Sequence, residues 1–558
     1  MKEKYIELME RALSGYTDEH IQRYFDDVKR DGLTEHGFPR LTSNIGILIA
    51  HGRCERLKPL FLEMMEFCCA TMPTRKAAND FSIREIICCI SEIEQSGVVE
   101  ASEIEGWKDH LRQFNPMTCY NRTVRSSKSK AKNWALFAAV SEFFRMKMGL
   151  CESEEFIERQ LATQIPSLDE NGMYMDAHSE THHPFLYDMG PRGLFALLLK
   201  AGYRGRYYEE IDDAIKRAGI LTLKMQSPNG EIPFGGRSNQ YIFNEPWMLA
   251  VFEYEASRYA KEGNTSLVRE FKAAIHRALR VTEKWLSMDP VLHIKNRFPT
   301  ETKFGCEEYA YFDKYMITAA SNLYAAYLLC DDSICESDVP DHQPTVFATS
   351  HHFHKLFLKA GGYGLEFDLD GDPHYDASGL GRVHREDAPS AICMSVPCPE
   401  DPKYCVNIDE PFAFSLAPGI LGDEKWEFAT TSDTKYEIVD SSSDDDSAYA
   451  TLCSHFAWGT DVTAKYTVNS DGVKIQVTGD GDVAYTLPAF YFDGEVHPEI
   501  VATENSLSVS YNGWVCRYTT DGTICDAQKI AANRNGNYKM YFATAKKELN
   551  VSIEIISC

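Results

Sequence analysis

The apolar residues of this sequence change their period part-way along the chain. As far as about Cys330 they recur at helical spacing, in segments such as WALFAAVSEFFRMKMGL, which predicts amphipathic and buried helices. From about Pro344, short runs such as TAKYTV and VKIQVTG alternate between apolar and polar residues, and Asp-Gly turns separate them as in β-hairpins. We therefore expect an α+β chain of two domains, with an all-helical domain at 1–335 and an antiparallel β-sandwich at 345–558.

Two polar stretches interrupt the regular patterns of the two domains. The domain boundary lies in CDDSICESDVPDHQP, where acids and prolines replace the helical period. The run SSSDDDS at 441–447 is expected to be a solvated loop of the sheet domain.

The starts of the apolar helices are regularly spaced. They lie near six positions: Asn44, Ile83, Asn133, Tyr187, Ile242 and Tyr309. Each interval holds two helices and two loops, so inner helices would alternate with outer ones as in repeat architectures. This spacing predicts an (α/α)6 toroid, with an open helical array as the alternative. In a toroid the inner-helix starts would share one mouth, and helix N-termini readily bind anions.

The charge and cysteine content narrow the partners and the compartment. Acidic residues outnumber basic ones by 83 − 57 = 26, which opposes binding to nucleic acid or to anionic membranes. No apolar run approaches the roughly 20 residues of a membrane span, and the amino terminus lacks the apolar core of a secretory signal. The adjacent pairs Cys68-Cys69 and Cys88-Cys89 are typical of buried small hydrophobic residues. We expect a cytoplasmic protein with reduced cysteines and no cofactor, and a homo-oligomer is compatible with these features.

The densest polar cluster is SPNGEIPFGGRSNQYIFNEPW at 227–247. Its paired glycines let the backbone approach a ligand, and Arg237 offers the planar fork that grips a carboxylate. We expect Arg237, Asn239, Gln240 and Glu245 to face the mouth. The alternative is a long loop that satisfies its own backbone.

A second cluster, MYMDAHSETHHPFLYDMGPRG at 173–193, contains three histidines. They lack the HExxH spacing that places two imidazoles on one helical face, so we expect a substrate loop rather than a metal site. The residues expected to face the mouth are Tyr187, Asp188, His182 and His183, while His178 belongs to the same stretch.

Further candidates lie at other helix starts and in the sheet domain. Asn133 and Trp134 open one helix, Glu308 and Tyr309 open another, and Arg297 precedes it. Acids at a helix entry are also simply favourable first-turn residues. In the sheet domain His384 would reach the mouth if the sandwich packs against it. Asp368, Asp370 and Asp372 resemble half a calcium loop, but Gly379 stands where the last ligand is expected, so we favour a hairpin turn.

These stretches together resemble a known group of enzymes. The segment NGMYMDAHSETHHPFLYDMGPRG, the GGRSNQ loop, KNR before EEYAYFDKYM, and YDASGLGRVHRED are similar to the heparinase II/III-like group, and within it most similar to the glycoside hydrolase family 154 β-glucuronidases. The resemblance covers ordered patches from Asn133 to Asp387. It implies an (α/α)6 toroid followed by a β-sandwich, acting on glycans that contain uronic acid. The missing signal segment departs from secreted relatives and favours short imported oligosaccharides.

Two reactions and one inactive state remain open. A hydrolase needs two carboxyl groups, for which Glu245, Glu308 and Asp188 are candidates, with Glu245 as the acid and Glu308 as the base or nucleophile. A lyase binds the uronate with arginine or asparagine and removes the C5 proton with tyrosine or histidine. Arg237, Asn239, Tyr187, His182 and His183 suit that role. We prefer a β-glucuronidase-like hydrolase to a lyase, and a glycan-binding protein without activity is the third alternative.

Overall fold

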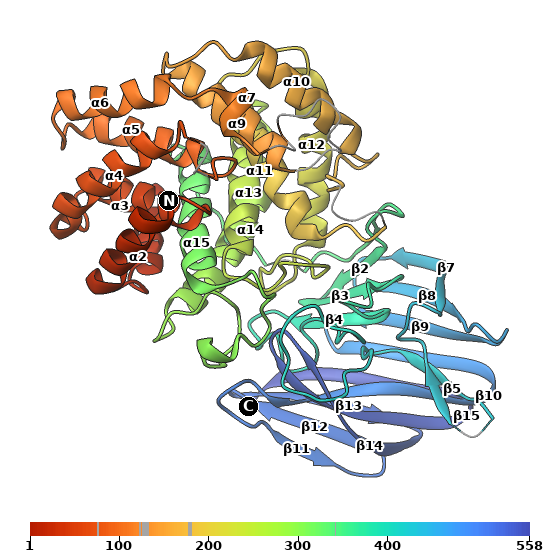
Figure 1. Ribbon diagram of the computed structural model, residues 1–558. Helices are drawn as coiled ribbons and strands as arrows, with labels where there is room; N and C mark the ends of the chain where they lie inside the picture. The colour runs from red at the N-terminus through yellow and green to blue at the C-terminus, as the bar shows by residue number, and fades with distance from the viewer. Residues whose placement is uncertain (75–77, 122–123, 125–132, 177–180, 341, 424) are drawn as a thin grey trace.

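The computed structural model describes residues 1–558 except 75–77, 122–123, 125–132, 177–180, 341 and 424. A helical half, red to green in Figure 1, is followed by antiparallel sheets, teal to blue. The last helix ends at Leu329 and the first strand begins at Thr345, so the predicted class and the predicted change of period are confirmed.

Six helices form a closed inner ring. They are α3 (Gly37–Ala50), α5 (Ile83–Ser96), α9 (Asn133–Lys147), α11 (Phe185–Lys200), α13 (Asn244–Lys261) and α15 (Phe312–Leu329). Each packs on the next in this order, and α15 packs back on α3. This last contact closes the ring, so the toroid is confirmed and the open array is not.

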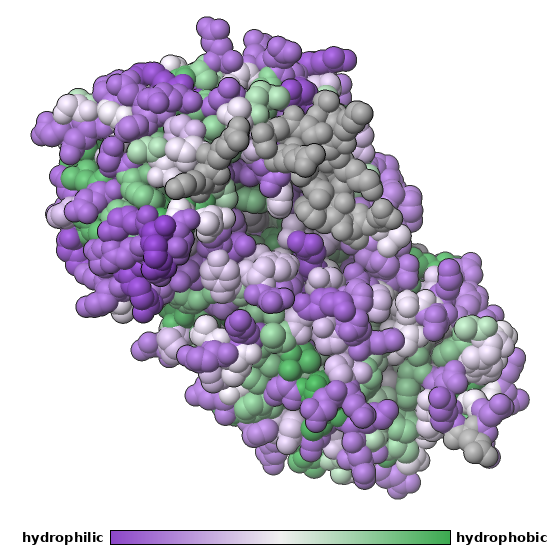
Figure 2. Space-filling model, viewed as in Figure 1, coloured by the Kyte–Doolittle hydropathy of each residue, from purple (hydrophilic) through white to green (hydrophobic). Residues whose placement is uncertain are grey.

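Outer helices cover the ring. They are α1 (Lys2–Leu13) on α15, α4 (Lys58–Thr71) on α3, α6 (Ala101–Arg112) on α5, α10 (Glu154–Gln164) on α9, α12 (Tyr208–Met225) on α11 and α14 (Thr265–Leu286) on α13. Two further helices are α2 (Asp18–Asp31) and α7 (Pro116–Cys119). The outer helices bury one stripe and expose another, and Figure 2 shows mostly hydrophilic residues on this face of the helical half. None of the helices, in the residues described, is long and apolar enough to span a bilayer.

The inner helices begin close to the predicted positions, with one exception. Helices α5 and α9 start at Ile83 and Asn133 as expected, and α11, α13 and α15 start within three residues of expectation. The start near Asn44 is wrong, because α3 already begins at Gly37. The segment HGFPR contains a glycine and a proline, yet it forms the start of this helix, because proline is tolerated in the first helical turn.

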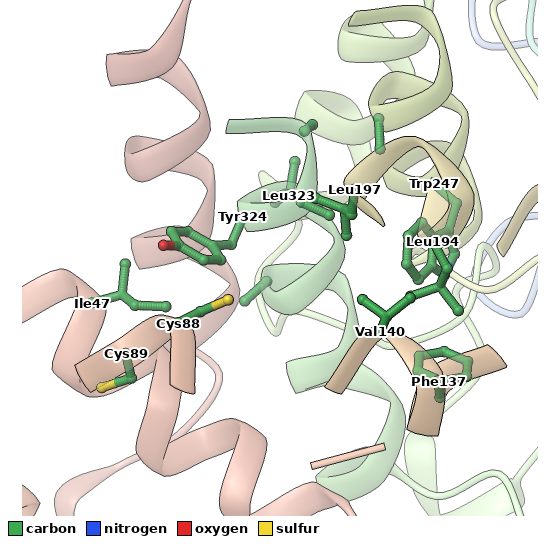
Figure 3. Close-up of a cluster of buried hydrophobic side chains, with 14 of the residues drawn as sticks. Ile47, Cys88, Cys89, Phe137, Val140, Leu194, Leu197, Trp247, Leu323 and Tyr324 are labelled. Atoms are coloured by element: carbon green, nitrogen blue, oxygen red, sulfur yellow. The ribbon is translucent and has the colours of Figure 1, made fainter. Parts of the chain in front are cut away.

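Apolar side chains from all six inner helices fill the centre of the ring. Figure 3 shows part of this core, with the labelled residues Ile47, Cys88, Cys89, Phe137, Val140, Leu194, Leu197, Trp247, Leu323 and Tyr324. Cys68, Cys69, Cys88 and Cys89 are buried without disulfides, as their pairing in the sequence predicts. Gly193 of α11 lies against the Trp247 ring, where a Cβ would come within 2.5 Å of a ring carbon. Glycine at this position therefore lets the two helices approach closely.

The C-terminal half is a sandwich of two antiparallel sheets. The small sheet has the order β1-β2-β3-β4, with bounds Thr345–Ala348, Lys355–Ala360, Tyr363–Asp368 and Gly379–Arg385. The large sheet runs β11-β12-β13-β15-β10-β9-β8-β7, with β14 paired to β15, and with β5 paired to β10 and β6. In chain order its strands are β5 (Pro418–Leu421), β6 (Trp426–Phe428), β7 (Lys435–Ser443), β8 (Ala448–His455), β9 (Asp461–Asn469), β10 (Gly472–Phe492), β11 (Glu499–Ala502), β12 (Ser506–Tyr511), β13 (Trp514–Thr520), β14 (Thr523–Asn533) and β15 (Gly536–Ser557).

One apolar core joins the two sheets. Phe367 of β3 packs edge-on against Tyr466 of β9, with ring centroids 4.7 Å apart, and the surrounding core residues come from both sheets. The segment 441–447, predicted as a loop, is the end of β7 and the exposed turn into β8. Asp368 ends β3 and pairs with Lys355, consistent with a hairpin rather than a calcium loop.

Candidate active site at the mouth of the toroid

A cavity of about 260 Å³ opens where the six inner helices begin. Because these helices alternate with outer ones, their N-terminal ends meet on one side of the ring. The lining residues come from every inner-helix start: His36, Arg40, Phe81, Asn133, Trp134, Phe137, Leu186, Tyr187, Gly190, Pro191, Arg237, Ser238, Phe243, Trp247, Tyr309, Lys314, Tyr315 and Thr318. The cavity therefore combines aromatic walls with three cationic side chains.

Arg237 lies between two tyrosine rings of this cavity. Its guanidinium carbon is 5.1 Å from the Tyr187 ring centre and 5.7 Å from that of Tyr309, and Nη2 donates to the Tyr187 hydroxyl at 3.3 Å. Burial opposes its charge, but the two tyrosines still raise the pKa of Arg237 above its ordinary value. Its buried Nε has no hydrogen-bond partner within the described part of the chain. An anionic ligand would satisfy this donor.

The tyrosine hydroxyls gather around Ser238. Its Oγ lies 3.4 Å from the hydroxyl of Tyr187 and 3.4 Å from that of Tyr309. Burial raises the pKa of Tyr309 and, more strongly, that of Tyr315, so both remain protonated at neutral pH. The Tyr187 hydroxyl also accepts a hydrogen bond from the Arg237 guanidinium.

Two more ionisable groups come from the start of α3. Arg40 is 3% exposed and donates to Thr318 Oγ1 at 2.7 Å. Burial lowers the pKa of Arg40 to about 10, which leaves it charged at neutral pH. Burial also lowers the pKa of His36 well below its usual value, so its imidazole is neutral at neutral pH.

The loop that carries Arg237 is held by carboxylates from both domains. The Gly236 amide donates to Asp376 at 2.7 Å, and the Ser238 amide donates to Glu307 Oε1 at 2.6 Å. Gly236 has φ 73°, and a Cβ there would lie 2.8 Å from Pro184. Glycine is therefore required at this close approach.

Glu307 is in turn held by Arg534, which lies in the turn between β14 and β15. Arg534 donates Nη2 to Oε1 at 2.7 Å and Nη1 to Oε2 at 3.1 Å, and Tyr241 also donates to this carboxylate. Burial alone would raise the pKa of Glu307, but Arg534 lowers it. The sheet domain thus positions the loop of the toroid through one buried ion pair.

The three carboxyl groups expected at the mouth lie elsewhere. Glu245 is buried, and Lys295 donates to it at 2.7 Å; burial raises the pKa of Glu245 despite this lysine. Asp188 is fully buried in a pair with Arg192 of its own helix. Glu308 is exposed. None of the three lines the cavity.

The other predicted binding residues divide between the mouth and the domain interface. Asn133, Trp134, Tyr187, Arg237 and Tyr309 line the cavity. The remainder lie outside it and contact other protein groups. Asn239 donates to the Pro233 carbonyl, Gln240 to Asn239, and Arg297 to Glu495. His384 contacts Ser227, and His183 contacts the Asp176 carbonyl. The structure therefore brings five of the predicted site residues together at one cavity.

A possible metal-ligand group lies beside the loop that leads into α11. His182, His354 and Asp370 each place a ligand atom within 4.8 Å of the others. His182 was expected to bind substrate, but its ring faces Asp370 of the sheet domain, and this contact raises its pKa. His178 lies outside the described residues. Imidazole and carboxylate suit zinc, so these three residues are able to hold such an ion.

Several lining residues were not anticipated from the sequence. They are His36, Arg40, Lys314 and Tyr315. The sequence pattern does not indicate His36 and Arg40, because it predicts the first inner-helix start near Asn44, after both residues. An i, i+4 pair of His and Arg around Gly37 would have signalled the mouth once that start was known.

Comparisons with known proteins give a likeness of fold. No family model and no curated protein matches the chain. Among solved structures, heparinase III is 9% identical, with a TM-score of 0.45 over 90% of this chain and 74% of its own. A chondroitin lyase, the baculovirus envelope protein ODV-E66, is 9% identical, with a TM-score of 0.46 over 96% and 84%. The heparan sulfate lyase HepC from Pedobacter heparinus is 8% identical, with a TM-score of 0.34 over 91% and 77%.

These likenesses concern the fold and not the reaction. They include, by name, a heparinase, the broader group that the sequence resembles. They give no support to its narrower part, the family 154 β-glucuronidases.

Proposed function

We propose that this protein is a glycan lyase that cleaves next to a uronic acid by β-elimination. One observation carries the proposal. The lining of the mouth includes Arg237, Arg40 and Lys314 together with three tyrosines and a neutral histidine, and it has no Asp or Glu among the described residues. Such a set recognises an anionic sugar and can move a proton.

Arg237 is the proposed anchor for the uronate carboxylate. Its Nε is buried without a partner in the described chain, and a guanidinium binds a carboxylate through paired charge-assisted hydrogen bonds. Neutralising the carboxylate makes the neighbouring C5 proton more acidic, because negative charge that develops at C5 delocalises into the carboxyl group.

Tyr187 is the proposed base. Its oxygen accepts a hydrogen bond from Arg237, which places it next to the proposed carboxylate anchor. Removal of the C5 proton breaks the C5–H bond, forms the C4=C5 double bond and expels the O4 leaving group, which takes up a proton. His36 faces the same cavity as a neutral imidazole and is the alternative proton acceptor.

Hydrolysis, the reaction preferred from the sequence, has less support. It requires two carboxyl groups about 5–10 Å apart across the scissile bond. Glu245 and Asp188 are instead held by Lys295 and Arg192, and Glu308 lies outside the cavity.

The test is to incubate the purified protein with oligosaccharides that contain uronic acid. A lyase produces an unsaturated uronate, which absorbs in the ultraviolet, whereas a hydrolase produces a new reducing end without that absorbance. We expect Tyr187→Phe to abolish the absorbance change and Glu308→Gln, a matched change outside the cavity, to leave it intact. Reducing ends without absorbance, together with an inactive Glu308→Gln protein, would overturn the proposal in favour of hydrolysis.

A further inference from the structure

A second group of candidate metal ligands lies on the outer face of the large sheet, in the sheet domain rather than at the mouth. Cys453 and His455 are two residues apart on β8, so their side chains point to the same face. Buried and half-exposed residues alternate along this strand, and both belong to the half-exposed set. Asp461 of β9 is the direct cross-strand partner of His455. The register of the hairpin therefore brings a thiol, an imidazole and a carboxylate together.

The distances within this group are close to those of a zinc site. Cys453 Sγ lies 3.9 Å from His455 Nδ1, and Nδ1 lies 2.9 Å from Asp461 Oδ1. All three ligand atoms lie within 4.8 Å of one another. Tetrahedral zinc with its usual bond lengths separates sulfur from nitrogen by about 3.6 Å and nitrogen from oxygen by about 3.3 Å. Changes of about 0.4 Å or less in the sulfur–nitrogen and nitrogen–oxygen distances would therefore give the geometry of a tetrahedral zinc site.

A fourth residue stands where a zinc-binding histidine usually has a supporting carboxylate. Glu437 of β7 is the cross-strand partner of Cys453, and its Oε2 lies 3.4 Å from His455 Nε2. A ligating histidine commonly donates its second ring N–H to such a carboxylate, which fixes the ring and its tautomer. The contact leaves Nδ1 as the nitrogen that faces Cys453 and Asp461.

We propose that Cys453, His455 and Asp461 bind Zn²⁺, and that Glu437 orients His455 for this purpose. Zinc would take the place of the proton shared by His455 and Asp461 and would displace the proton of the Cys453 thiol. Three protein ligands leave one position for water or an external ligand. A thiolate in the set favours zinc over magnesium or calcium.

The experiment uses the full chain, stripped of metal and kept reduced, with Zn²⁺ or Co²⁺ as the probe. Calorimetry with Zn²⁺ gives the number of bound ions, and Co²⁺ gives a thiolate-to-cobalt charge-transfer band only where a cysteine is a ligand. The group His182, His354 and Asp370 has no thiol, so the band separates the two places. Cys525→Ser on β14 is the matched control, because Cys525 is half-exposed and belongs to neither group.

We expect the band in the wild-type protein and in Cys525→Ser. In Cys453→Ser and in His455→Ala we expect the band to disappear and the number of bound Zn²⁺ ions to fall by one. Glu437→Gln should keep the stoichiometry and weaken Zn²⁺ binding about 10–100-fold. The variants change a solvent-facing patch, and urea unfolding without metal should match the wild type. A wild-type protein without the band, or a band that survives in Cys453→Ser or His455→Ala, would overturn the proposal.

Discussion

At the mouth of the toroid, the Arg237 side chain makes one hydrogen bond to the rest of the described chain, whereas at the junction with the sheets the Arg534 side chain makes three. Both guanidinium groups are enclosed by aromatic rings. Arg534 shares its surroundings with the carboxylate of Glu307, and Arg237 has no carboxylate beside it among the residues that line the cavity.

The same contrast extends to the other charged groups of the two regions. Beneath the mouth, Glu245 is matched by Lys295 and Asp188 by Arg192. A buried charge that is fully paired contributes to structure and is costly to break. A cation without such a partner is instead available to a ligand. The difference teaches that the carboxylates of Glu245 and Asp188 build the scaffold, while the unmatched arginine is the group that we propose binds the substrate.

The largest effect should follow from breaking the scaffold pair. Arg534→Ala leaves Glu307 as an uncompensated buried charge, which we expect to lower the free energy of unfolding by about 3–5 kcal/mol. Urea denaturation measures this loss. If Arg534→Ala unfolds like the wild type, the distinction between paired scaffold charges and unmatched site charges fails.

A smaller effect, on activity rather than stability, should follow at the mouth. Arg237→Lys keeps the charge but loses the planar fork, so we expect cleavage of a uronate substrate to weaken by about 1.5–3 kcal/mol, the range for hydrogen bonds to charged groups. The free energy of unfolding should hardly change. Comparing kcat/KM on a uronate substrate with that on a neutral-sugar analogue measures the effect, and equal losses on both would assign Arg237 to general positioning.

Glu255, a buried carboxyl group on α13, tests the same comparison, because its arginine partner offsets only part of the cost of burying its charge. Glu255 accepts from Arg258 at 2.8 Å, yet burial raises its pKa from 4.5 to about 7. The folded protein therefore holds a proton that the unfolded chain releases, and stability should fall as pH rises from about 4.5 to about 7, by up to about 1.4 kcal/mol per pH unit. Glu255→Gln should flatten this slope in denaturation curves measured across that range. An unchanged slope would show that another group causes it.

The smallest effect should come from Arg297, which the sequence offered as a substrate contact. It forms a partly exposed pair with Glu495, and such pairs contribute less than about 1 kcal/mol. Arg297→Ala should therefore leave both the unfolding curve and the activity close to wild type. A large loss of activity would place the substrate nearer the domain junction than the mouth.

The parts of this structure that could be predicted are those that local pattern determines. The change of period and five of the six inner-helix starts follow from residues close in sequence, and helix starts that share one mouth bring Asn133, Tyr187, Arg237 and Tyr309 together. The position of Glu245 could not be predicted in this way. Its environment depends on Lys295, fifty residues away, so the apolar neighbours that suggested an acid with a raised pKa did not reveal the lysine.

The role of the sheet domain was equally hidden. His384 was expected to reach the mouth, but the residue that supports the mouth is Arg534, which lies 227 residues after Glu307. No spacing rule connects two such distant positions. Arg534 stands in a hairpin turn, where a polar residue is ordinarily solvated.

The link from the β14–β15 turn to the Arg237 loop sets an order of events during synthesis. Asn535 donates to Gln240 across 295 residues of sequence, so the helical half leaves the ribosome long before its loop can acquire these partners. Contacts between such distant segments form late, because a long stretch of chain must be ordered first. A nascent chain that has completed the ring therefore has a mouth whose loop is not yet locked. Competence to hold a carboxylate should appear only when the last hairpin docks.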